Sequence, residues 1–141
     1  MTNKKACNLR DRIIKEMVVD YANALERNFD LAKQFIRITR DGKIDIRFKD
    51  KLTGIEQILL YLIGKLYAKE AGFTDTESVG NKELMDELGI TRGSLLPWLK
   101  SLRDHNKIKQ IKKGKHTYHA IPVNLVEKTL KSIERKIKKN M

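Results

Sequence analysis

The sequence predicts a mainly helical chain with small β-hairpins, an α+β fold. Several long stretches carry apolar residues at the three- and four-residue steps of helices. Two other stretches, 35–48 and 107–122, alternate in polarity around a glycine, as hairpins do. With 141 residues and 40% apolar content, the chain can form one compact core with extensions, but it is too short for two full domains.

The first predicted element is one continuous helix over residues 9–35, about seven turns long, because this stretch contains neither glycine nor proline. Its apolar positions follow the seam of a coiled coil, with an asparagine at one of them. A second copy is the partner we expect for this stripe, which predicts a homodimer, although the chain's own C-terminal helix would also cover it. The expected dimerisation residues are Ile14, Val18, Tyr21, Leu25, Asn28, Ala32 and Phe35.

A hairpin should follow, with its turn around Asp41 and Gly42. A two-residue loop would place isoleucines opposite charged residues. A three-residue loop, 40–42, with Gly42 in a left-handed bulge, instead pairs Ile38 with Ile44 and Ile36 with Ile46. The pattern therefore favours the bulged turn.

The middle of the chain predicts three helices. Thr53 and Glu56 form a capping box for a buried helix that stops at Gly72, and Asn81 should cap a two-turn helix that ends at Gly89. Thr91 should cap a third helix, Arg92 to about His105, whose inward stripe is Leu95, Leu99 and Leu102.

The last elements are a hairpin over about 108–121, which turns at Lys113 and Gly114, and an amphipathic C-terminal helix. Asn124 and Glu127 occupy capping-box positions of that helix. Its apolar face is Val126, Leu130, Ile133 and Ile137, and we expect it to pack against the N-terminal helix of its own chain or of a partner.

Charge is distributed unevenly along this chain, whose net charge is +12. The balance of basic over acidic residues is +4 over 1–50, −3 over 51–90 and +11 over 91–141. An acidic middle beside a strongly basic end indicates a surface that attracts a polyanion, and nucleic acid is the first candidate.

Residues 52–122 resemble the winged helix-turn-helix family of DNA-binding domains, of the transcription-regulator type. The resemblance rests on Glu83, Leu84 and Leu88, on "GITRGSLLPWLKSL" at the turn and third helix, on Ile108, and on Gly114 at the hairpin tip. Asn106 stands where the family commonly has glycine, and asparagine tolerates the left-handed conformation. The chain then divides into an N-terminal helix and hairpin (1–51), the winged domain (52–122) and a basic C-terminal helix (123–141).

The resemblance implies that the third helix, about 91–105, enters the major groove of double-stranded DNA and that the wing touches the backbone or minor groove. Arg92 is the best candidate for reading a base, because its guanidinium can meet a guanine with two hydrogen bonds. Lys100 and Arg103 should position the helix on phosphates. The full expected DNA-binding set is Thr91, Arg92, Ser94, Leu96, Pro97, Lys100, Arg103, Lys109, Lys112, Lys113, Lys115 and His116.

Leu96 and Pro97 argue for a second hypothesis. They can read little except a thymine methyl group, and Pro97 lacks the amide hydrogen that would bond Gly93, so we expect a kinked or loosened helix there. The alternative is a winged-helix interaction module that docks a protein partner through Leu96, Pro97 and Trp98. Trp98, which flanks the inward stripe, is expected at the edge of the core.

No catalytic constellation stands out. His116 and His119 lie three apart on an expected strand and point to opposite faces, which is wrong for shared metal ligation, and both are expected at the surface. We therefore expect no enzyme, cofactor or metal. The single cysteine and the absence of a long apolar run predict an intracellular, cytoplasmic and nucleoid-associated protein without membrane contact.

Overall fold

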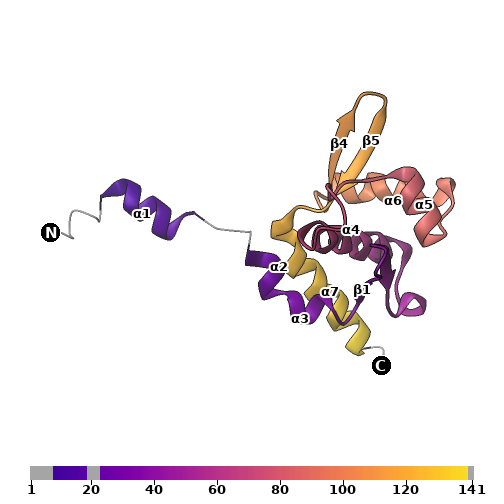
Figure 1. The fold of residues 1–141 in the computed structure, drawn as a ribbon, viewed down its shortest axis with the longest axis horizontal. Coiled ribbons are helices and arrows are strands. Elements are labelled where there is room, and N and C mark those ends of the chain that lie inside the picture. The colour runs from indigo at the N-terminus through magenta and orange to yellow at the C-terminus, as the bar shows by residue number, and fades with distance from the viewer. Residues whose placement is uncertain (1–7, 19–22, 140–141) are drawn as a thin grey trace.

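A computed structural model describes residues 8–18 and 23–139. It is a mixed α and β structure whose core gathers around one central helix, α4 (Gly54–Glu70). Figure 1 shows α4 in the middle of the body, with the hairpin of β4 (Lys109–Lys113) and β5 (His116–Ala120) projecting from it. The eight residues from Ile58 to Ala68 that are buried in α4 lie on more than one side of the helix, because neighbours pack all around it.

The N-terminal stretch is not one helix, and this prediction was wrong. The structure has three separate helices instead: α1 (Leu9–Glu16), α2 (Ala24–Arg27) and α3 (Phe29–Ala32). Asn28 ends α2 and begins α3, and its side-chain amide donates a 2.8 Å hydrogen bond to the carbonyl of Ala24. The helical spacing of apolar residues therefore held locally while the helix axis changed direction.

The first hairpin, β1 (Ile36–Ile38) and β2 (Ile44–Ile46), confirms the register derived from the pattern. Ile36 pairs with Ile46 and Ile38 with Ile44, and Gly42 has a φ of 86°. The hairpin lies on α4 so closely that a Cβ on Gly64 would come within 2.6 Å of Ile44.

The capping box of α4 is present, because Thr53 accepts a hydrogen bond from the amide of Glu56 and Glu56 accepts one from the amide of Thr53. A short 3-10 helix (Lys49–Lys51) precedes α4. Gly72, with a φ of 87°, follows its end, as expected.

Two further helices, α5 (Asn81–Leu88) and α6 (Arg92–Asp104), follow with Gly89 in a left-handed conformation between them. The predicted cap of α5 was wrong, because Gly80 occupies that position and Asn81 is the first helical residue. The cap of α6 is confirmed: Thr91 accepts a hydrogen bond from the amide of Ser94. Asn106 adopts a φ of 56°, the left-handed conformation that asparagine tolerates.

A short strand, β3 (Val79–Gly80), joins the second hairpin in a three-stranded antiparallel sheet with the order β3-β5-β4. A 3-10 turn (Val123–Leu125) then leads into α7 (Val126–Lys139). That turn replaces the capping box expected from Asn124 and Glu127, and Glu127 instead pairs with Lys131 at 2.9 Å. The predicted apolar face of α7 is confirmed, since its four residues are all buried.

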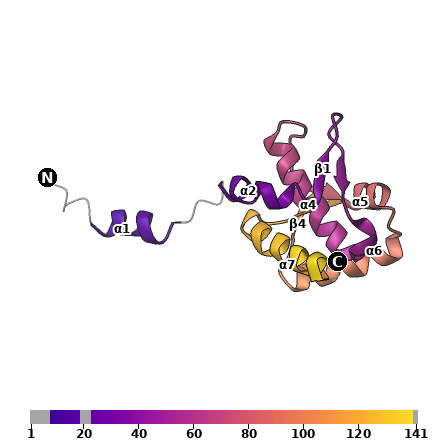
Figure 2. The same ribbon diagram turned by 90° about the horizontal axis from the view of Figure 1, so that it is seen from below.

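Helix α7 packs on α2, α3 and α4 of its own chain, and Figure 2 shows it running along the underside of the body. The core thus combines residues from the N-terminal, middle and C-terminal parts of the chain in one cluster. Within residues 8–18 and 23–139, none of the helices combines the length and apolarity needed to cross a membrane.

Candidate nucleic-acid interface

The start of α6 presents the polar residues that the sequence singled out there. Thr91 and Arg92 are exposed, whereas Ser94, whose amide donates to the Thr91 hydroxyl, is half-buried. Arg92 forms no ion pair within the part of the chain that the structure describes, so its guanidinium is available to a ligand. Gly93 beside it leaves open space where a Cβ would stand.

Further along α6, the outward face mixes apolar and charged side chains. Leu96 is 38% exposed and Pro97 is exposed next to it. The helix is continuous through Pro97, so the expected loosening does not interrupt it. Lys100 is held by Asp104 at 2.8 Å in an exposed ion pair that a phosphate can displace at little cost. Arg103 is half-buried.

Trp98 faces the core and not the outer surface of α6. A Cβ on Gly54 would lie within 2.2 Å of its ring, so the indole sits directly over the first turn of α4. The prediction that Trp98 lies at the edge of the core is confirmed. Of the three residues of the docking hypothesis, Leu96 and Pro97 are exposed, whereas Trp98 is partly buried against α4.

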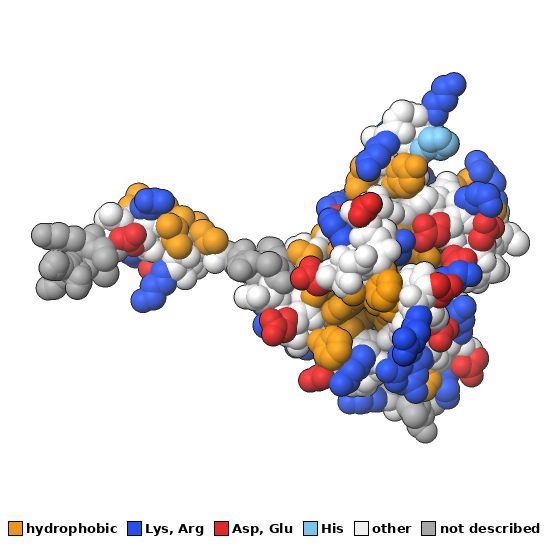
Figure 3. Space-filling model, in the orientation of Figure 1, with side chains coloured by type: hydrophobic (Ala, Val, Ile, Leu, Met, Phe, Trp, Pro, Cys, Tyr) orange, Lys and Arg blue, Asp and Glu red, His pale blue; other side chains and the backbone are white. Residues whose placement is uncertain are grey.

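The β4–β5 hairpin carries the densest group of free cations that the sequence predicted. Its turn is Gly114, with a φ of 63°, and Lys115, and Lys113 pairs with His116 across it. Lys112, Lys113, Lys115 and His116 are all exposed. Figure 3 shows blue and pale-blue side chains at the free end of the hairpin, away from the body. Between Asp104 and Glu127 the sequence has no acidic residue that would neutralise them.

The two faces of the hairpin differ. Lys113, His116 and Tyr118 share one face, where the Lys113 ammonium lies 5.9 Å from the centre of the Tyr118 ring. Lys112 lies on the other face, opposite Thr117. Cations on both faces suit a hairpin that meets phosphates along its tip, because each face can approach a different strand of the backbone.

Lys109, at the base of the hairpin, has a different environment from the tip. Its charge contributes to the lowered pKa of Glu77, after the larger effects of the hydrogen bond from Lys69 and a backbone hydrogen bond. An acidic neighbour makes Lys109 a weaker candidate for phosphate binding than the lysines at the tip.

His119 is a buried residue, which corrects the expectation of a surface histidine. One ring nitrogen, Nε2, lies 2.7 Å from the Asn81 side-chain oxygen, while Nδ1 is buried without a partner. Burial, together with the smaller effect of the Arg103 charge, lowers the pKa of His119 to about 4. The imidazole is therefore neutral at pH 7, donates from Nε2 to Asn81 and ties the sheet to the start of α5.

The residues predicted to form a dimer seam lie in different environments in the structure. Asn28, Ala32 and Phe35 are buried inside the chain, where α7 covers α2 and α3, and Leu25 is partly buried beside them. Ile14 and Val18 are 51% and 58% exposed on and just after α1. Tyr21 lies outside the described residues. Over residues 8–18 and 23–35 the apolar residues do not form a continuous seam. The chain's own C-terminal helix covers the second half of the predicted stripe, which is the alternative that the sequence left open.

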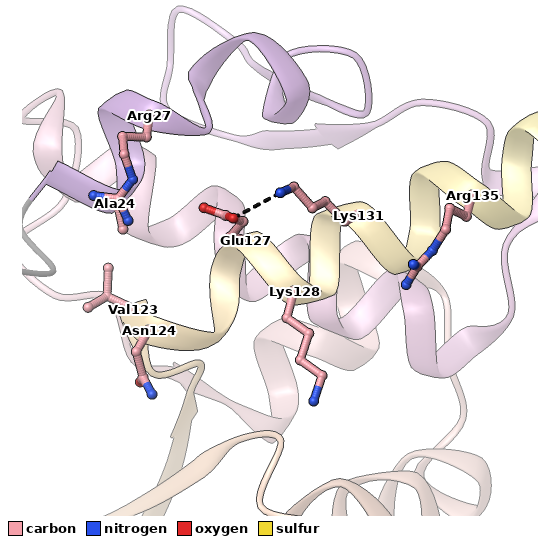
Figure 4. Close-up of a pocket in the computed structure, with 8 residues that line it drawn as sticks. All are labelled: Ala24, Arg27, Val123, Asn124, Glu127, Lys128, Lys131 and Arg135. Carbon is pink, nitrogen blue, oxygen red and sulfur yellow. Dashed lines mark hydrogen bonds and ion pairs between the residues drawn. The ribbon is translucent and has the colours of Figure 1, made fainter.

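A cavity of about 430 Å³ between α2 and α7 collects basic side chains. Figure 4 shows that Arg27, Lys128 and Arg135 point in different directions and that Lys131 is paired with Glu127. The cations do not converge on one point, so the cavity has no built anion site. Among the residues that the structure describes, no three His, Cys, Asp or Glu side chains are grouped so as to hold a metal ion.

Sequence reasoning missed one surface completely: an apolar groove beside α3, between α2, β1 and the end of α4. Its residues were assigned to the continuous N-terminal helix and the first hairpin, so no single segment signalled it.

Comparison with known proteins adds no further guide to function, since no family model, curated protein or solved structure matches this chain.

Proposed function

We propose that this chain is a winged helix-turn-helix protein that binds double-stranded DNA and acts as a transcriptional regulator. In this proposal α6 enters the major groove and the β4–β5 hairpin is the wing. The order of α4, β3, α5, α6 and the hairpin supports the family resemblance of residues 52–122. The observation that carries the proposal is the projecting hairpin tip with Lys112, Lys113 and Lys115, all exposed and without an ion pair in the described chain.

The roles differ between the two elements. The wing lysines neutralise phosphates on any sequence, because phosphate contacts carry no base information. Arg92, at the exposed start of α6, reads a base edge through its forked guanidinium. Leu96 and Pro97 add an apolar contact at most, so sequence reading depends on few groups and on DNA shape.

Salt-dependent titration of duplex DNA tests the wing. The variant with Lys112, Lys113 and Lys115 changed to alanine should bind every duplex more weakly. The slope of log affinity against log salt should fall by about 0.9 for each phosphate that the variant no longer neutralises. A matched control changes Lys43, Lys49 and Lys51, three exposed lysines far from the hairpin in sequence, and should leave affinity nearly unchanged. Equal losses of affinity in both variants would reduce the effect to net charge.

Arg92→Ala tests base reading separately. It should cost about 1 to 3 kcal/mol on a sequence selected from random duplexes and much less on random DNA. If the wing variant binds duplex DNA as tightly as the parent, the proposal is wrong.

A protein-docking function remains as the second candidate, because Leu96 and Pro97 are exposed apolar residues on α6. It predicts that Leu96→Ser with Pro97→Ala leaves DNA affinity intact. That same variant would then fail to bind the protein partner.

A further inference from the structure

Helix α1 has an apolar face that nothing in the described chain covers. Leu9, Ile13 and Met17 follow one another at steps of four and are 71%, 39% and 74% exposed. None of the eight residues of α1 is buried. A helix this short is marginal in water without packing, because nucleation costs more than so few hydrogen bonds return. The helix therefore needs a surface to dock on.

The same chain carries an apolar groove without an occupant. A cavity of about 890 Å³ opens between α2, α3, β1 and the end of α4. Its floor includes Leu25, Phe29, Ile36, Ile38 and Tyr67. In Figure 3 it is the orange hollow in the centre of the body.

The groove has a fixed shape. The Tyr67 hydroxyl donates a 2.6 Å hydrogen bond to the Leu25 carbonyl, which ties α4 to α2 across the floor. Burial raises the pKa of Tyr67 to about 12, so the phenol remains a donor at neutral pH. The Phe29 ring packs against Tyr67 at a centroid distance of 6.5 Å and is still 52% exposed. A groove that presents an exposed aromatic ring and is held in place by a hydrogen bond is suited to bind the apolar face of a helix.

Charged side chains of both signs surround the groove, because Lys33 and Arg37 line it as well as two glutamates. Glu26 and Glu70 line the groove, and neither forms an ion pair within the described residues. On α1, Arg10 lies beside the apolar line and is likewise without a carboxylate partner in the described part of the chain. A docked α1 would allow Arg10 to pair with Glu26 or Glu70.

We propose that α1 of one copy docks in the groove of a second copy, and that the second copy returns its own α1 to the first. Figures 1 and 2 show α1 lying apart from α2, α3, β1 and α4, the elements that form the groove. Each chain offers one helix and one groove, so a two-fold pair satisfies both surfaces at once and closes without leaving a free end. This inference goes beyond the proposed DNA binding, and it replaces the continuous coiled coil that the sequence predicted with an exchange of arms.

Sedimentation equilibrium on the full chain tests the exchange. The parent should have twice the 16.4 kDa chain mass at micromolar concentration. Changing Leu9, Ile13 and Met17 to serine should weaken the dimer by more than about 100-fold, because three apolar side chains per arm lose their cover. Asp11→Ser with Lys15→Ser, on the opposite face of α1, should leave the mass unchanged. A monomeric parent, or a dimer indifferent to the apolar triple, would overturn the proposal.

The groove is tested by its own pair of variants. Phe29→Asp should dissociate the dimer, whereas Phe73→Asp should not, since Phe73 is equally exposed at 49% but lies outside the groove. Circular dichroism of both variants controls for folding. A folded Phe29→Asp protein that remains dimeric would show that the groove is not the docking site.

Crosslinking separates a second copy from the chain's own arm. In a Cys7→Ser background, one protein carries Ile13→Cys and another, distinguishable by mass, carries Glu70→Cys. A short bismaleimide should join the two when they are mixed. If the double variant Ile13→Cys, Glu70→Cys instead crosslinks within one chain and stays monomeric, α1 covers its own groove and the exchange is refuted. DNA titration of that monomer, with and without the wing lysines, would still test the proposed function independently.

Discussion

His119 shows how one buried side chain links two elements near the candidate interface. Its ring holds Asn81 at the start of α5 from strand β5, and it has no second partner. A charged imidazole is penalised in this position, because burial and the nearby Arg103 both disfavour the extra proton. The fold therefore requires the neutral form.

That requirement makes stability depend on pH. The folded-state pKa of about 4 lies below the ordinary value of 6.5, so the unfolded chain takes up the proton first as the pH falls. The free energy of unfolding should be fully retained above pH 6.5 and should drop by about 2 to 3 kcal/mol on the way to pH 4. Urea titrations at several pH values measure this slope.

The variant His119→Gln, which keeps a donor for Asn81, should flatten the slope between pH 6.5 and pH 4. His116→Gln, three residues away on the exposed tip, should retain it. Equal slopes in the two variants would assign the pH dependence to the carboxylates. Alternation along the strand correctly placed the two histidines on opposite faces of the sheet. It could not show which face would be buried, because His119 meets Asn81 of α5, which is distant in sequence.

At the scale of elements, the contact between α4 and α6 depends on a glycine at the first position of α4. A Cβ on Gly54 would lie 2.2 Å from the Trp98 ring, and a rigid indole cannot yield as a flexible side chain does. The two helices approach each other this closely only because Gly54 has no side chain.

Gly54→Ala should therefore lower the free energy of unfolding by about 1 to 3 kcal/mol, since a methyl group is forced into a packed contact. It should also shift the fluorescence of Trp98, the single tryptophan of the chain. The matched control is Gly93→Ala, on α6, where a Cβ meets nothing within 4 Å. That change should stabilise the protein by about 0.5 to 1 kcal/mol through helix propensity. Destabilisation by both substitutions would mean that neither effect comes from Trp98.

Local rules predicted some elements well. The register of the first hairpin followed from pairing isoleucines with isoleucines, and the caps at Thr53 and Thr91 need only residues three positions apart. The cap assigned to Asn81 failed because a distant residue, His119, binds that side chain instead. A local pattern is reliable only where its polar groups have no better partner elsewhere.

The long N-terminal helix failed for a related reason. Apolar spacing at steps of three and four does not reveal where a helix ends: α1 ends at Glu16, and Asn28 stands between α2 and α3, where its side chain donates to the carbonyl of Ala24. The exposed cations of the candidate interface were easier to identify, because a basic hairpin tip without acidic neighbours stays at the surface in any packing. The groove beside α3 could not be predicted from sequence patterns, because four elements meet to form it.

At the scale of the whole molecule, the three sequence ranges 1–51, 52–122 and 123–141 contribute to one core. Leu130 of α7 is fully buried, and its cluster includes Phe35 from the first range and Leu60 from the second. Elements that share a core should unfold together.

Leu130→Ala should accordingly destabilise the entire chain by about 2 to 5 kcal/mol. Trp98 fluorescence, which reports on the contact of α6 with α4, and far-ultraviolet circular dichroism should shift to lower denaturant together. Lys131→Ala, one residue along on the exposed side of α7, should change stability by less than about 1 kcal/mol. Two separate transitions would show that residues 123–141 are an independent unit.

The position of α7 also governs when the core can close during synthesis. Helices α2 and α3 leave the ribosome well before α7, although α7 supplies the surface that covers them. Their apolar side chains remain exposed to solvent until residues 126–139 have been translated. Closing a loop of about a hundred residues then completes the core, so folding should be late and slow for so helical a protein.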